Sequence, residues 1–135
     1  MSKAYRFEFD AENKILLMRF EEARITDKLL GEVHKATRQY AIATDAHAGI
    51  ADYSSVNQVE VSAAFIRQLA LEEPAMLRAS ERGRIVVVKD DVGFGLARMF
   101  QMLGEPTRPL FLVVRSFDEA LEALGVASPQ FELLP

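Results

Sequence analysis

The fold is decided by the stretch Arg84-Ile85-Val86-Val87-Val88-Lys89, which contains an unbroken run of apolar, β-branched side chains. Such a run is typical of a strand that is covered on both faces, as in the parallel sheet of an α/β protein. Residues 84–89 are therefore predicted to form a central strand. Because parallel neighbours need crossover connections, helices are expected before and after it.

On the carboxyl side of this strand, the signals of a helix, a strand and a second helix follow in turn. Apolar periodicity predicts a helix over residues 91–103, which ends at Gly104 because glycine readily takes the left-handed conformation found after helices. Residues 110–115 are predicted to form a further strand. Ser116 and Glu119 have the spacing of a capping box, so a short helix is expected after Ser116.

On the amino side, residues 5–9 alternate aromatic with charged side chains and residues 14–20 are rich in Ile, Leu and Met. These two segments are predicted to form an antiparallel hairpin. A helix is expected over residues 26–40, where apolar residues recur every three to four positions. Residues 48–53 have the length of a buried strand, and residues 62–73 have helical periodicity that Pro74 breaks.

The element order predicts one α/β domain over residues 1–125, with about four helices and a single mixed five-stranded sheet. The sheet combines the N-terminal antiparallel hairpin with parallel crossovers. Residues 75–81 are expected to add a turn or two of helix. Residues 126–135 form a C-terminal tail outside the pattern, and its apolar residues are expected to dock in a groove of their own domain or of a neighbour in a dimer.

Composition narrows the classes of function. Half of the 135 residues are apolar, the formal net charge is -4 and there is no cysteine. The negative charge gives no attraction toward nucleic acid, and the lack of cysteine removes disulfides and thiolate ligands. No apolar stretch approaches the roughly 20 residues of a membrane span, and the amino terminus has no signal-peptide pattern. A cytoplasmic protein without a membrane span is expected.

A family resemblance is carried by this element order and by Asp52-Tyr53-Ser54-Ser55-Val56-Asn57-Gln58-Val59-Glu60-Val61-Ser62-Ala63. The chain resembles the STAS domain, and within it the SpoIIAA-like branch. Aligned with the Asp-Ser-Ser-Gly motif of anti-sigma-factor antagonists, Glu60 falls on the aspartate and Ser62 on the phosphorylated serine, whereas Val61 and Ala63 depart from the motif. The resemblance implies a regulatory domain, with Ser62 as a candidate phosphoacceptor of an antagonist switched by phosphorylation.

Ser62 also has a simpler interpretation. A serine before a helix accepts a hydrogen bond from a free amide of the first turn, which stabilises the helix by about 1 kcal/mol. A phosphate at the same position would meet the positive end of the helix and add nearly two negative charges. Both interpretations use the same geometry, so the sequence leaves both open.

The helix predicted over residues 91–103 is apolar around much of its circumference. Core packing, the tail, a second copy, a partner helix or an apolar ligand could each cover it. Gly93 and Gly95 are interpreted as room for this helix to approach the sheet or a ligand. The candidate partner or ligand surface comprises Glu60, Ser62, Phe94, Met99, Phe100 and Met102.

No set of residues in the chain has the spacing of a catalytic or metal site. The two histidines, His34 and His47, are expected at the surface and are too few for a zinc site without cysteine. Arg78, Arg82 and Arg84 are interpreted as an ordinary basic surface. We therefore expect no enzyme activity, no metal and no cofactor.

Two kinds of binding function remain. The first is a non-catalytic regulatory or interaction module that presents the loop before residue 62 and part of the helix over residues 91–103 to a protein partner or a second copy. The alternative is a carrier or sensor of a small apolar or lipid-like molecule, held between this helix and the sheet. The SpoIIAA-like branch resembles lipid-binding folds in its strand and helix order, which supports the alternative.

Overall fold

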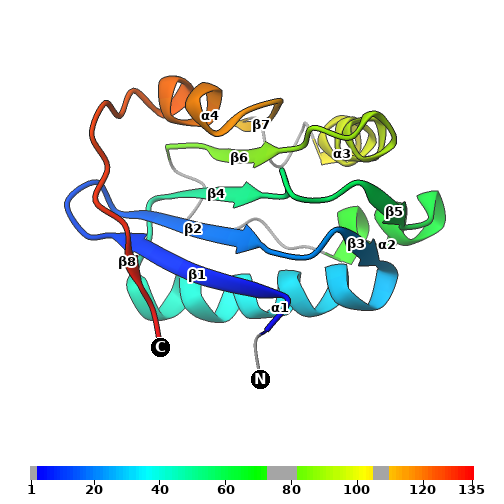
Figure 1. Ribbon diagram of the computed structural model, residues 1–135, viewed down its shortest axis with the longest axis horizontal. Coiled ribbons are helices and arrows are strands. Elements are labelled where there is room, and N and C mark those ends of the chain that lie inside the picture. The colour runs from blue at the N-terminus through cyan, green and yellow to red at the C-terminus, as the bar shows by residue number, and fades with distance from the viewer. Residues whose placement is uncertain (1–2, 73–81, 105–109) are drawn as a thin grey trace.

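The structure, a computed structural model, describes residues 3–72, 82–104 and 110–135. These residues form a mixed main sheet of six strands with helices on both faces (Figure 1). In spatial order the strands are β7 (Phe111–Val114), β6 (Arg84–Val87), β4 (Ala48–Asp52), β2 (Ile15–Phe20), β1 (Tyr5–Asp10) and β8 (Glu132–Leu133). β1 is antiparallel to β2 and β8, whereas the other neighbours are parallel. The predicted hairpin and parallel crossovers are confirmed.

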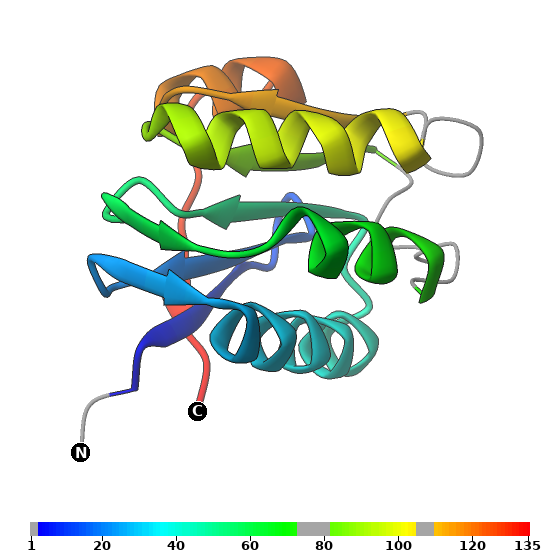
Figure 2. The ribbon, with the colours of Figure 1, turned by 90° about the vertical axis from the view of Figure 1, so that its right-hand side faces the viewer.

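Four helices form within the described residues, as the sequence predicts. They are α1 (Asp27–Thr44), α2 (Ala63–Glu72), α3 (Asp91–Gly104) and α4 (Phe117–Leu124). Figure 2 shows α1, α2 and α3 side by side in front of the main sheet. α4 packs on the opposite face, against β6 and β7. None of the described helices is both long enough and apolar enough to cross a membrane.

The sheet divides the apolar core into two layers because successive strand residues point to opposite faces. On β2, Leu16 and Met18 pack in the layer formed with α1, α2 and α3. Ile15 and Leu17 pack in the other layer, together with α4. Both faces of the central strands are therefore buried, which explains the continuous apolar run at residues 85–88.

Side-chain caps lie at the amino ends of α1 and α4, and the cap on α4 is the one that the spacing of Ser116 and Glu119 predicts. Thr26 precedes α1, and its hydroxyl oxygen accepts a hydrogen bond of 3.3 Å from the amide of Leu29. Ser116 caps α4 by accepting from the amide of Glu119 at 3.1 Å. Gly125 then ends α4 with a φ of 70°, a left-handed conformation that favours glycine. The ends of these helices are therefore set by local sequence.

The prediction of a five-stranded sheet is wrong because the tail adds β8 as a sixth strand (Figure 1). β1 would otherwise present an open edge of amides and carbonyls, and β8 pairs with it. The amide of Leu134 donates to the carbonyl of Phe7 at 2.9 Å. The amide of Gln130 donates at 3.3 Å to Asp10, a buried aspartate in the β1–β2 turn. The tail thus docks on its own domain, while the helical turns predicted for residues 75–81 lie outside the described residues.

A second, two-stranded sheet lies at the carboxyl ends of the central strands. β3 (Arg24–Thr26) pairs in parallel with β5 (Gln58–Glu60). Both strands are short extensions of the chain between a main-sheet strand and the following helix. The sequence analysis assigned neither segment to a strand, because three residues are too few to show a periodicity.

Candidate functional site

A cavity of about 120 Å³ lies between the main sheet and α1, α2 and α3. Its walls are mostly apolar, and every one of these elements contributes to them. Representative lining residues are Leu16, Met18 and Val86 from the sheet, Leu30 from α1, Ile66 from α2 and Phe100 from α3. The structure therefore contains a mostly apolar pocket in the position that the ligand hypothesis requires.

Gly49 is one of the residues that border this space. It lies inside β4, between Leu16 of β2 and Arg84 of β6, and lines the cavity. A Cβ atom added at Gly49 would meet only the carbonyl oxygen of Leu16 at 3.8 Å, an ordinary contact. A glycine within a central strand weakens the strand and often marks the close approach of a ligand or another backbone. The sequence interpretation overlooked Gly49, although its place within a predicted buried strand was a visible signal.

The cavity is bounded at the carboxyl ends of the strands by the small sheet. Ile25 of β3 and Val59 of β5 both line it. α3 approaches closely here because Gly93 has no side chain: a Cβ atom there would lie 2.9 Å from Val88 and 3.4 Å from Val59. The interpretation of Gly93 as room for a close approach is confirmed. Gly95 differs, because an added Cβ atom would meet nothing within 4 Å.

Two residues predicted to lie at the surface line the cavity instead. Arg84 is only 9% exposed, and its guanidinium carbon lies 5.8 Å from the centroid of the Phe111 ring. His34 is half-buried on α1, with its ring centroid 5.9 Å from that of Phe100. Both predictions failed because the position of a residue within its strand or helix decides which face it lies on, and the predictions for His34 and Arg84 did not consider that position.

The other residues expected at the surface give mixed results. Arg82 is exposed, and it donates at 2.7 Å to the carbonyl of Asn13. Arg78 lies outside the described residues. His47 is half-buried rather than exposed, and its Nε2 atom is enclosed without a hydrogen-bond partner.

Ser62 lies directly before α2 and caps it. Its hydroxyl oxygen accepts from the amide of Phe65 at 3.1 Å. The same hydroxyl donates at 3.1 Å to the carboxylate of Asp27, which also accepts from the amide of Ser62 at 2.9 Å. Ser62 is therefore held between two helix amino ends, with a negative charge next to its hydroxyl.

Glu60 lies nearby on β5 but makes separate contacts. Its carboxylate pairs with the guanidinium of Arg24 across the small sheet, with one hydrogen bond of 3.0 Å between Nη2 and Oε1. Hydrogen bonding to Arg24 lowers the pKa of Glu60 below its usual value. Both side chains are exposed, so the pair joins β3 to β5 without forming a buried site.

The four candidate residues on α3 do not form one surface. Phe100 is 4% exposed and lines the cavity, whereas Met102 is 63% exposed. Phe94 is half-buried beneath the guanidinium of Arg115, which lies 3.9 Å from the ring centroid. Met99 is half-buried against the core layer. The structure therefore brings only Phe100 of the six predicted residues into the cavity wall.

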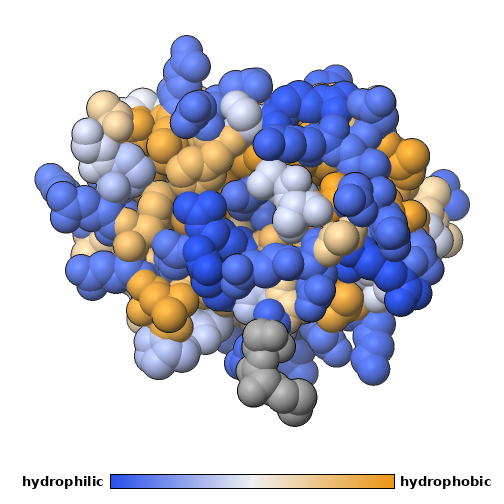
Figure 3. Space-filling model, in the orientation of Figure 1, coloured by the Kyte–Doolittle hydropathy of each residue, from blue (hydrophilic) through white to orange (hydrophobic). Residues whose placement is uncertain are grey.

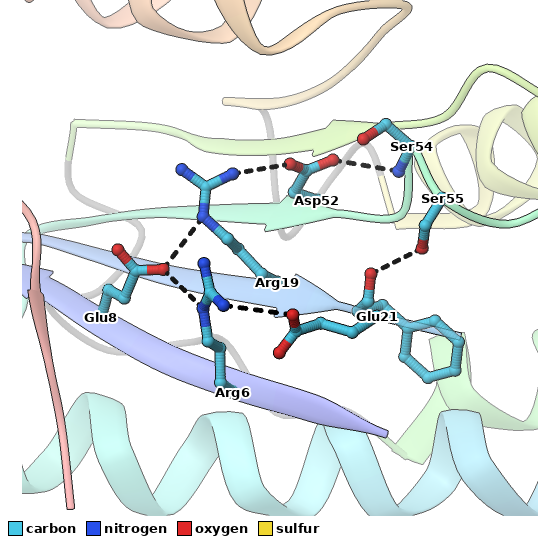
Figure 4. A network of polar contacts seen from close by, with 8 residues as sticks. Arg6, Glu8, Arg19, Glu21, Asp52, Ser54 and Ser55 are labelled. Atoms are coloured by element: carbon cyan, nitrogen blue, oxygen red, sulfur yellow. Dashed lines mark hydrogen bonds and ion pairs between the residues drawn. The ribbon is translucent and has the colours of Figure 1, made fainter. Parts of the chain in front are cut away.

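A charged network occupies the opposite face of the sheet, over β1, β2 and β4 (Figure 4). Arg19 pairs with Glu8 at 2.9 Å and with Asp52 at 3.2 Å. Arg6 pairs with the same Glu8 at 2.9 Å and with Glu21 at 3.1 Å. Figure 3 shows hydrophilic side chains gathered over the middle of the strands on the face that it presents. The paired charges explain why this part of the sheet needs no covering helix.

The loop after β4 is tied to this network and to β2. Asp52 is buried, and its carboxylate accepts from the amide of Ser54 at 2.9 Å (Figure 4). The hydroxyl of Ser55 donates to the carbonyl of Phe20 at 2.6 Å. These contacts position the chain that leads into β5 and α2. In the described parts of the chain, no three His, Cys, Asp or Glu residues are grouped so as to hold a metal ion.

Comparison with models of known protein families gives no match. A search of curated proteins also finds no match. Function must therefore be argued from the cavity and the surface of this chain.

Proposed function

We propose that this domain is a non-catalytic binding module that holds a small apolar molecule between its main sheet and α1, α2 and α3. The cavity of about 120 Å³ is the observation that carries the proposal. Apolar cavities of roughly 150 Å³ bind benzene. The occupant is therefore a molecule close to benzene in size, which narrows the lipid-like ligand of the sequence-based hypothesis to a much smaller compound.

The free energy of folding also favours a cavity that binds a ligand. Closed apolar cavities left by truncated core side chains cost about 24 cal/mol per Å³, because the atoms that line them lose packing contacts. Gly49 adds to the cost, because glycine in a strand loses more conformational freedom on folding than a larger residue. A single larger side chain at Gly49 would remove part of both costs. A ligand that occupies the space when bound recovers the lost contacts.

Toluene is a suitable first probe, because it is neutral and close to benzene in size. Ligand-observed NMR and isothermal titration calorimetry would measure its binding to the wild-type protein, to Gly49→Val and to Gly95→Ala. We expect the wild type and Gly95→Ala to bind toluene and Gly49→Val to bind it at least tenfold more weakly. Equal binding by Gly49→Val, or no binding by the wild type, would exclude the cavity as a ligand site.

A second candidate function is protein interaction, which exposed apolar residues support. β7 lies at one end of the main sheet, and Leu110 and Leu112 beside its edge are 50% and 42% exposed. On α3, Val92, Met102 and Leu103 are also exposed. Apolar side chains next to a strand edge are typical of surfaces that pair with another chain. Sedimentation of the wild type and of Leu112→Lys tests self-association, which the substitution should abolish.

The STAS-like assignment remains part of the proposal, supported by the order of strands and helices in the sequence. A phosphorylation switch at Ser62 has less support. A phosphate there would lie beside the carboxylate of Asp27, whose oxygen is 3.1 Å from the Ser62 hydroxyl. Repulsion between these negative charges would oppose the modification.

A further inference from the structure

β4 contributes the smallest side chains on the cavity side of the main sheet. Successive strand residues face opposite sides, and Ile50 packs in the layer with α4, so Gly49 and Ala51 face α1, α2 and α3. Both residues line the cavity and are half-buried. Parallel strands are normally covered on both faces, so this partial exposure marks where the cavity reaches the sheet.

Larger side chains of the neighbouring strands stand on both sides of these two residues. On β2, Leu16 is the register partner of Gly49, and Met18 is the register partner of Ala51. On β6, Val86 is the register partner of Ala51. All three larger side chains are buried and line the cavity. Gly49 and Ala51 therefore form the floor of a trough along β4, with walls from β2 and β6.

The sheet geometry sets the dimensions of this trough. Neighbouring strands lie about 4.8 Å apart, so the backbones of β2 and β6 are about 10 Å apart, and the wall side chains occupy part of that width. Along β4, Gly49 and Ala51 are two residues apart, which corresponds to about 6.6 Å. Tyr53 follows in the same core layer and also lines the cavity. Its large side chain ends the trough at the carboxyl end of β4.

We infer that the ligand lies lengthwise along β4 and has the shape of a para-substituted benzene, and that Ala51 selects this shape. This inference rests on the proposed function, since it names the shape of the molecule in that cavity. The floor length of about 6.6 Å is close to the roughly 6 Å between the methyl carbons of p-xylene. With about 120 Å³ available, one ring with short substituents is the largest suitable body.

Ala51 determines the shape because its side chain is a single methyl group. Ala51→Val would add two carbon atoms to the floor between Met18 and Val86, and would leave only the part beside Gly49 open. The shortened floor holds a ring but not a substituent opposite it. Burying one methyl group is worth roughly fourfold in affinity, and a methyl group forced against a wall costs more.

The test compares p-xylene with o-xylene by ligand-observed NMR. The two isomers contain the same atoms and have nearly the same hydrophobicity, so a difference in affinity reports shape. We expect the wild type to bind p-xylene at least about fourfold more tightly than o-xylene. Ala51→Val should lose this preference and still bind benzene. Ala123→Val makes the same change at an exposed alanine of α4, on the opposite face of the sheet, and should retain the preference.

The outcomes separate the inference from the proposed function. Equal affinity of the wild type for the two isomers, or binding of toluene without p-xylene, would overturn the lengthwise placement and leave the apolar cavity site standing. A preference that survives in Ala51→Val, or a loss of benzene in that variant, would overturn the selective role of Ala51. No binding of toluene or of either xylene would overturn both. The wild-type comparison decides the placement even if Ala51→Val does not fold.

Discussion

Filling the cavity at Gly49 should stabilise the protein while removing its binding site. Gly49→Val adds three carbon atoms, and the first of them has only an ordinary contact, 3.8 Å from the Leu16 carbonyl oxygen. Burying three such groups contributes about 2.4 kcal/mol at roughly 0.8 kcal/mol each. Restricting the unfolded chain adds about 0.4–1 kcal/mol, and imperfect packing of the branched side chain removes about 1–2 kcal/mol. The expected net gain is about 1–2 kcal/mol.

Urea unfolding, followed by circular dichroism, measures this gain as a rise in the unfolding midpoint. For a chain of 135 residues, the corresponding rise in Tm is about 5 °C. Gly95→Ala is the matched control, because its Cβ atom meets nothing within 4 Å and alanine favours a helix by about 1 kcal/mol over glycine. Both variants should gain stability, but only Gly49→Val should lose toluene binding. A Gly49→Val protein less stable than the wild type would refute the argument that usable space lies beside Gly49.

Three further predictions concern Gly93, Asp10 and Ser62. Gly93→Ala should destabilise the protein by about 1–3 kcal/mol in urea unfolding, because its Cβ atom would lie 2.9 Å from Val88. An unchanged urea midpoint of unfolding would contradict the close approach of α3. Burial alone raises the pKa of Asp10, but hydrogen bonds from its turn and from the tail outweigh this and lower the pKa below its usual value. The carboxylate therefore contributes stability above about pH 4, which is lost as the pH falls through the lowered pKa. Asp10→Asn should cost about 1–3 kcal/mol at pH 7 and much less at pH 2, and a cost independent of pH would disprove this role. Ser62→Ala should lower the stability by about 1 kcal/mol in thermal melts, because the helix cap is lost. Ser62→Glu should lower the stability at least as much, because its carboxylate would lie near that of Asp27. A Ser62→Glu protein as stable as the wild type would remove the electrostatic objection to phosphorylation.

The predictions from sequence succeeded where a signal is local. The run at residues 84–89 produced β6, and the spacing of Ser116 and Glu119 produced the capped start of α4. Such signals depend on residues within a few positions of one another, so a sequence displays them directly. Strands of two or three residues, such as β8 and β5, have no detectable period, and they form because a neighbouring strand offers hydrogen-bonding groups.

What the sequence by itself determined is the class of the fold: strands and helices in an order that requires parallel crossovers, with polar caps at the helix ends. Only the tertiary structure decided where the cavity lies and that Arg84 belongs to its wall. The physical reason is that a cavity is defined by side chains from several elements at once. Gly49, Ile66 and Phe100 are separated along the chain, and their shared space exists only after the helices have packed on the sheet.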